Sequence, residues 1–151
     1  YLKRYAKLGG IELQSSLDEP DRELDPATEL AIFRIVQEAI ANVRKHSQAT
    51  QVRVRLSFAG ENALLEIHDN GVGIPPSEGV RSSSDRYITT EERYLGQSDG
   101  AKRGSRKRSH MGLRGMRERA AALGGELEIV SPSTGGTRVR ATLPISRRDM
   151  L

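Results

Sequence analysis

Four polar residues in the segment FRIVQEAIANVRKH, residues 33–46, have side chains suited to binding a polyphosphate with a divalent cation. They are Glu38, Asn42, Lys45 and His46, and their helical spacing of i, i+4, i+7 and i+8 puts them on one face. Oxygens from Glu38 and Asn42 are the hard donors that Mg²⁺ prefers, and it completes its shell with water and phosphate oxygens. Lys45 would meet phosphate as a point charge. Because glutamate and lysine also pair on solvated helices, the pattern alone leaves both interpretations open.

A second candidate lies in EIHDNGVGIPP, residues 66–76, where an apolar run stops at Asp69 and a glycine-rich segment follows. Asn-Gly after a strand is a strong hairpin signal. However, only three residues separate that pair from two consecutive prolines, which cannot donate to a return strand. We therefore interpret Asp69 as an acid that meets a ligand at the end of a strand, with the glycines leaving room for it.

A third candidate is MGLRGM, residues 111–116, which we predict to open a helix. Free backbone N–H groups and the positive end of the helix dipole would form an anion site there, and Gly112 and Gly115 would let phosphate approach the backbone. The alternative is that Gly112 is an ordinary loop residue and Gly115 only allows close helix packing.

The elements that must position these residues follow from periodicity. Asp25-Pro26 predicts a helix start, and an apolar stripe predicts a helix to about residue 46 that buries Leu30, Phe33, Val36, Ile40 and Val43. A further helix is predicted over residues 113–123, and strands over 11–17, 51–58, 62–68, 126–130 and 137–143. These elements predict an α+β fold, a two-layer α/β sandwich whose mixed, mostly antiparallel sheet has helices on one face.

The chain of 151 residues predicts a single domain, 1–151, within which residues 75–110 have little apolar periodicity. We interpret 75–110 as a long flexible lid with a short helix near residues 90–94. Its basic run, AKRGSRKR at 101–108, has no interleaved aromatic residues, so we expect a solvated segment and no direct nucleic-acid contact. The absence of cysteine excludes disulfides and thiolate sites, and no P-loop, dinucleotide-binding glycine motif or hydrolase nucleophile elbow is present.

Taken in order, these segments resemble the ATP-binding catalytic domain of sensor histidine kinases, the HATPase or Bergerat fold. Residues 33–46 resemble its N box, 69–73 its G1 box, 110–125 its G2 region, and 136–144 its closing strand. The segment NVRKH followed by MGLRGMRERAAALGG is most similar in sequence to the subfamily of kinases paired with helix-turn-helix response regulators. The resemblance runs from about residue 10 to residue 144.

The resemblance implies ATP and Mg²⁺ as ligands, with Asn42 and Glu38 at the metal and Glu38 as the catalytic acid that supports the metal or polarises a water. Asp69 would accept a hydrogen bond from the adenine amino group, and guanine, which presents a carbonyl there, would be rejected. Thr137 would reach the adenine beside it. The implied nucleotide-binding residues are Asn42, Lys45, His46, Asp69, Gly71, Gly73, Ile74, Gly112, Leu113, Arg114, Gly115, Met116 and Thr137.

The same resemblance implies partners outside this chain. Histidine kinases phosphorylate a histidine on an upstream helical dimerisation domain, and none of His46, His68 and His110 lies in such a context. We therefore expect a monomeric, cytoplasmic domain that binds ATP without autophosphorylation, with its own dimerisation domain and a response regulator as partners. Membrane attachment of the parent protein stays open. Two alternatives on the same fold also stay open: an anti-sigma-factor-type serine/threonine kinase and a non-catalytic nucleotide-binding module.

Overall fold

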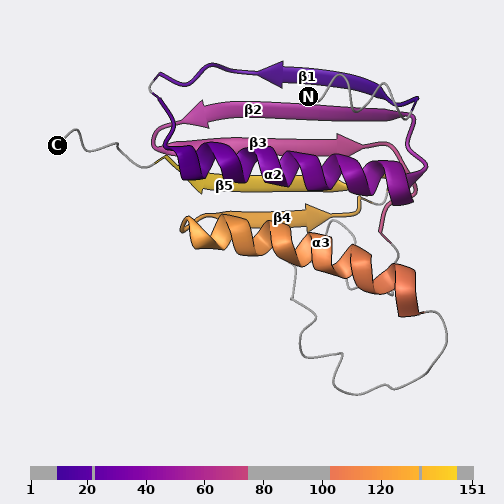
Figure 1. Ribbon diagram of the computed structural model, residues 1–151. Helices are drawn as coiled ribbons and strands as arrows, with labels where there is room; N and C mark the ends of the chain where they lie inside the picture. The colour runs from indigo at the N-terminus through magenta and orange to yellow at the C-terminus, as the bar shows by residue number, and fades with distance from the viewer. Residues whose placement is uncertain (1–9, 22, 75–102, 133, 146–151) are drawn as a thin grey trace.

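The fold has two layers, a five-stranded sheet and two helices on one of its faces (Figure 1). The computed structural model of the chain describes residues 10–21, 23–74, 103–132 and 134–145, with side chains in the second helix from residue 112 onward. Its elements are β1 (Glu12–Leu17), α2 (Pro26–Asn42), the π-helical turn η1 (Val43–Ser47), β2 (Gln51–Ala59), β3 (Asn62–Asp69), α3 (Arg103–Ala122), β4 (Glu126–Val130) and β5 (Arg138–Pro144).

The strand order is β1-β2-β3-β5-β4, in which β1 runs parallel to β2 and every other neighbouring pair is antiparallel. Alternation in the sequence explains which face of each strand is buried: in β2, Val52 and Val54 point to the core, whereas Arg53 and Arg55 are exposed. The α+β sandwich with a mixed, mostly antiparallel sheet is confirmed.

Helix α2 starts where its capping sequence predicts. The carboxylate of Asp25 accepts hydrogen bonds from the backbone N–H groups of Ala27 (2.9 Å) and Thr28 (3.1 Å), and Pro26 occupies the first helical position. Its second carboxylate oxygen accepts a hydrogen bond from the Thr28 hydroxyl.

The predicted buried stripe of α2 is wrong in its first half. Leu30 and Phe33 are 55% and 41% exposed, whereas Ile32 and Ile35 are buried together with Val36. At about 100° per residue, Leu30 falls on the far side of the helix axis from the stripe that faces the sheet. The shorter Thr28 and Ala31 take the core positions of the first turns instead, with the Thr28 side chain satisfied by Asp25.

The end of this helix also differs from the prediction. The α-helix stops at Asn42, and a wider π-helical turn from Val43 to Ser47 follows, ended by Gln48 in the left-handed conformation. The α-helical spacing that put Lys45 and His46 on one face with Glu38 and Asn42 therefore does not extend past Asn42.

Helix α3 begins at Arg103 rather than at Leu113, which corrects two predictions. Residues 103–110 of the predicted lid are helical, while the rest of that lid, with the short helix expected near 90–94, lies outside the described residues. Gly112 and Gly115 lie well inside the helix, where backbone N–H groups bond to the preceding turn, so no anion site of the helix-N-terminus type exists at these glycines.

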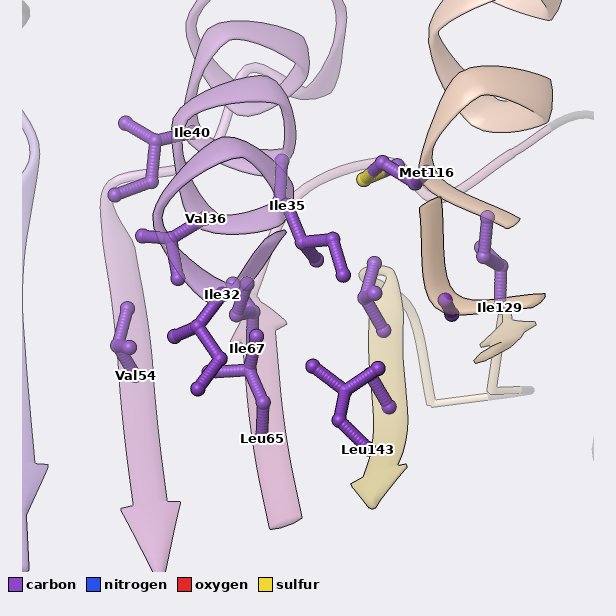
Figure 2. Packing of buried hydrophobic residues seen from close by; sticks show 14 of the residues in the cluster. Ile32, Ile35, Val36, Ile40, Val54, Leu65, Ile67, Met116, Ile129 and Leu143 are labelled. Atoms are coloured by element: carbon purple, nitrogen blue, oxygen red, sulfur yellow. The ribbon is translucent and has the colours of Figure 1, made fainter. Parts of the chain in front are cut away.

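The core lies between the two layers (Figure 2). Four isoleucine and valine side chains of α2 pack on β2, β3 and β5, and Met116 of α3 lies fully buried between the helices and Ile129 of β4. Burying a side chain of this size contributes about 1.5–3 kcal/mol, so α2 and α3 are held mainly by this interface. Among the described residues, no helix combines the length and the apolar character needed to cross a membrane.

The Asp25 cap gives the first testable prediction. Asp25→Ala should lower the free energy of unfolding by about 1 kcal/mol and the melting temperature by about 2–4 °C, measured by calorimetry, because two backbone donors lose their acceptor. The hydrogen bond from Thr28 lowers the pKa of Asp25 in the folded state below its ordinary value of 3.8. The charge therefore stabilises the fold above the unfolded pKa, and this contribution is lost as pH falls through the folded pKa.

Asp25→Asn is the matched control, since asparagine caps as well as aspartate but does not titrate. Its stability should stay near that of the unmodified chain at neutral pH, with a shallower loss in acid. An alanine variant as stable as the asparagine variant would contradict the capping role.

Candidate functional site

The site is built around Asp69, the last residue of β3. Asp69 is only 3% exposed, and its Oδ1 accepts a hydrogen bond of 2.8 Å from the backbone N–H of Gly71, two residues on. Its own N–H donates to the carbonyl of Thr137 at 3.0 Å, which brings the start of β5 beside it. Burial raises the pKa of Asp69, and hydrogen bonding from Gly71 acts in the opposite direction. A buried acid at the end of a strand, with a pKa raised by burial, is a candidate for binding a ligand donor.

Asn70 explains why the chain does not turn back at the Asn-Gly pair. Its side-chain Oδ1 accepts hydrogen bonds from the N–H groups of Thr50 (3.0 Å) and Gln51 (2.9 Å), and its Nδ2 donates to the Thr50 hydroxyl at 3.0 Å. Its N–H donates to the Gln51 carbonyl. These bonds direct the chain past the start of β2, and residues 70–74 form no strand. The prediction that this is not a hairpin is confirmed.

Glycines let three segments meet at Asp69 with no side chains between them. A Cβ on Gly71 would collide with the Ser47 carbonyl, and a Cβ on Gly136 would collide with the Asp69 carbonyl. Gly136 also donates its N–H to the Gly71 carbonyl at 2.7 Å, and Gly73 and Gly136 have φ of +76° and +80°. Only glycine adopts such conformations freely, so these positions tolerate no other residue without strain.

A second group lies between α2 and α3. A Cβ on Gly112 would collide with Oε1 of Glu38, so the missing side chain lets α3 lie directly against this carboxylate. Asn42 is one helical turn beyond Glu38, half-buried, and its Nδ2 is buried without a hydrogen-bond partner. A half turn about the last side-chain bond would put the amide oxygen in the place of this nitrogen, so the position can present a hard oxygen donor.

The structure separates the remaining predicted residues by exposure. Lys45, His46 and Arg114 are exposed, and Arg114 forms an ion pair with Glu118 at 2.7 Å. The other predicted residues of α3 are enclosed to different degrees: Leu113 packs against the core, Gly115 lies close to the Arg119 side chain, and Met116 is fully buried. The Met116 side chain is part of the core, and the predicted ligand contact of this residue stays a prediction.

Three residues of the site were missed by sequence reasoning. Asn70 anchors the segment to β2, Ser47 accepts a backbone hydrogen bond of 2.8 Å from Val72, and Ser131 bonds to the backbone of Ile74. Asn70 carried a local signal, since asparagine next to glycine commonly bonds to backbone groups in turns. Ser47 and Ser131 carried none, because their partners are distant in the sequence.

Comparison with known proteins adds independent support. Residues 27–147 match the family model described as "Histidine kinase-, DNA gyrase B-, and HSP90-like ATPase". The chain is 33% identical over 132 residues to the sensor protein VraS of Staphylococcus haemolyticus, covering 87% of this chain and 30% of that protein. It is 33% identical over 118 residues to VraS of Staphylococcus aureus, covering 78% of this chain and 26% of that protein. The chain thus spans less than a third of the length of these relatives.

Solved structures show the same fold. The histidine kinase domain of the blue-light activated kinase of Erythrobacter litoralis EL346 superposes with a TM-score of 0.64 at 21% identity, over 97% of this chain and 58% of that one. The histidine kinase AdeS of Acinetobacter baumannii gives 0.62 at 16% identity, over 97% and 60%. With the family model covering both the α2 segment and the buried Asp69, the chain belongs to the family of histidine kinase-, DNA gyrase B- and HSP90-like ATPases.

Proposed function

We propose that this chain is the catalytic ATP-binding domain of a two-component sensor histidine kinase, which binds Mg²⁺-ATP and donates its γ-phosphoryl group to a histidine on a separate helical domain. The observation that carries the proposal is the buried carboxylate of Asp69 at the end of β3. Glycines around it leave the space beside Asp69 without side chains of their own. The family match and the relatives named sensor proteins support it.

Asp69 would select the nucleobase. Oδ1 accepts the Gly71 N–H and Thr137 also hydrogen-bonds to Asp69, but an ionised carboxylate has about four acceptor positions, so it can still accept a hydrogen bond from the adenine amino group. Guanine has a carbonyl oxygen at the corresponding position, and two acceptors facing each other in a buried site are unfavourable. Thr137 beside Asp69, with Gly71, Gly73 and Ile74, would complete the base-binding side.

Glu38 and Asn42 fit a magnesium ion that is shared with substrate phosphates. The described residues contain no cluster of three or more His, Asp or Glu side chains suited to a metal. Mg²⁺ commonly takes one or two protein oxygens and fills its shell with phosphate oxygens and water, so Asn42 with Glu38 nearby is sufficient. Bound there, the metal would neutralise charge on the transferring phosphoryl group. Glu38 would hold a metal-bound water or the metal itself, and the exposed Lys45 and His46 would contact phosphate and nucleoside.

The partners follow from this reaction. The acceptor histidine would lie on a dimerisation domain, and the phosphoryl group would pass to a response regulator. The resemblance of NVRKH and MGLRGMRERAAALGG to one subfamily supports a regulator with helix-turn-helix output. The domain itself would be cytoplasmic.

The role of Asp69 is tested by Asp69→Asn. We expect ATP affinity to fall about 10- to 100-fold in calorimetry, because a charge-assisted hydrogen bond is replaced by an amide that donates toward the adenine amino group. The ratio of ATP to GTP affinity should fall as well, since the amide can donate to the guanine carbonyl.

Asp69→Asn should lower ATP affinity but should not lower the stability of the fold at neutral pH. Burial raises the folded-state pKa of Asp69 above 3.8, so its stabilisation is complete below the unfolded pKa and is lost as pH rises through the folded value. The asparagine side chain does not ionise, so above that window the variant should melt at an equal or higher temperature. Asp18→Asn, in an exposed position, is the control. Wild-type ATP binding by Asp69→Asn would disprove the adenine assignment.

The role of Asn42 is tested through the metal. Asn42→Ala should reduce the gain in ATP affinity that Mg²⁺ produces, measured by titration with and without EDTA, because the protein loses an inner ligand. The control is Asn62→Ala, at the end of β3 opposite to Asp69, and it should leave the gain in ATP affinity from Mg²⁺ unchanged. A full magnesium dependence in the Asn42 variant would exclude this residue as the ligand.

A further inference from the structure

Ser131, the residue after β4, makes hydrogen bonds in two directions at the base-binding side. Its Oγ accepts the backbone N–H of Ile74 at 3.1 Å and donates to the carbonyl of Gly136 at 3.0 Å. The two partners lie 57 and 5 residues away in the sequence. One hydroxyl thus joins the segment that follows Asp69 to the turn that precedes Thr137.

The contact is close because Gly73 has no side chain. A Cβ on Gly73 would collide with Ser131 Oγ and come within 2.9 Å of the Gly136 carbonyl. The Gly136 N–H is bonded to the Gly71 carbonyl, so the two segments are joined both by backbone and through Ser131. Asp69 and Thr137, which would present their side chains to a base, lie next to this junction and are hydrogen-bonded to each other through the Asp69 N–H and the Thr137 carbonyl.

Two backbone hydrogen bonds also join these segments, from the Asp69 N–H to the Thr137 carbonyl and from the Gly136 N–H to the Gly71 carbonyl, whereas the remaining contacts fix only one segment. Asn70 joins residues 69–74 to β2, and Ser47 accepts the N–H of Val72. Neither of these two hydrogen bonds involves the Gly135-Gly136 turn. The Ser131 hydroxyl bonds to both segments at once, and the Thr137 side chain also hydrogen-bonds to Asp69.

We propose that Ser131 is a positioning residue for base recognition, which together with the direct Asp69–Thr137 hydrogen bonds sets the placement of the Asp69 carboxylate and Thr137 and thereby contributes to discrimination of adenine from guanine. The proposal rests on the function proposed above, because it concerns the same base-binding side. Ser131 would touch neither base nor phosphate, and acts through the backbone of residues 73–74 and 136–137.

The experiment compares Ser131→Ala, Ser131→Thr and the control Thr134→Ala, which removes an exposed hydroxyl from the same turn. Three quantities are measured on each: amide hydrogen exchange at Ile74 without nucleotide, the ratio of ATP to GTP affinity by competition, and the melting temperature. Ser131→Ala should accelerate exchange at Ile74 and lower the affinity ratio about tenfold, the effect of one hydrogen bond. Ser131→Thr, which keeps the hydroxyl, and Thr134→Ala should match the unmodified chain.

Faster exchange at Ile74 in Ser131→Ala with an unchanged affinity ratio would overturn the proposal, since the tether would then be only structural. Unchanged exchange would overturn it as well. If the melting temperature shows that the alanine variant does not fold, Ser131→Cys, with similar size and weaker hydrogen bonding, takes its place with the same expected direction. The failures are distinguishable. An unmodified chain that does not bind ATP refutes the proposed function, whereas an unmodified chain and a Ser131→Ala variant that discriminate equally well refute only the role of Ser131.

Discussion

The arrangement of the site depends on burying one carboxylate at the end of a strand. Burying an acid is unfavourable because its charged form loses water, and burial raises the pKa of Asp69 accordingly. The hydrogen bond from the Gly71 N–H to the Asp69 carboxylate offsets part of this cost. Residue 71 can approach so closely because a glycine has no Cβ to collide with Ser47 or Asp69. A buried carboxylate that has lost its water lowers the stability of the fold. It is well suited to selecting a ligand that donates a hydrogen bond. This end of the sheet is therefore the place where the proposed function puts the adenine base.

Holding Asp69 there requires elements from the whole fold. Segment 70–74 is anchored to the start of β2 by Asn70, to the end of η1 by Ser47 and to the β4–β5 connection by Ser131. The elements that carry these anchors share one core: α2 packs on the central strands, and Met116 joins α3 to the same core. The second half of the site, Glu38 and Asn42, is carried by α2 itself, and its distance from Asp69 is therefore set by helix-on-sheet packing.

Local chemistry predicted much of this structure. Alternating strands, the Asp25-Pro26 cap and the glycines after α3 gave element types and most boundaries, because each signal acts between neighbouring residues. The two larger errors concern longer-range effects. The rotation of α2, which exposes Leu30 and Phe33, is decided by which side chains fit against the sheet, and periodicity was compatible with more than one stripe. The start of α3 at Arg103 was missed because a run of arginine and lysine carries no apolar periodicity, although these residues are good helix formers.

Residue types and short spacings were enough to predict the α+β class, the family and the acid Asp69 with its glycines. Three features became visible only in the folded chain: Asp69 is buried with a raised pKa, Gly112 lies against Glu38 rather than at a helix start, and Met116 belongs to the core. Burial and close approach are properties of segments brought together from distant parts of the chain. The contacts of Ser131 with Ile74 and Gly136 are of this kind, because a hydroxyl that joins residues 57 positions apart leaves no local pattern.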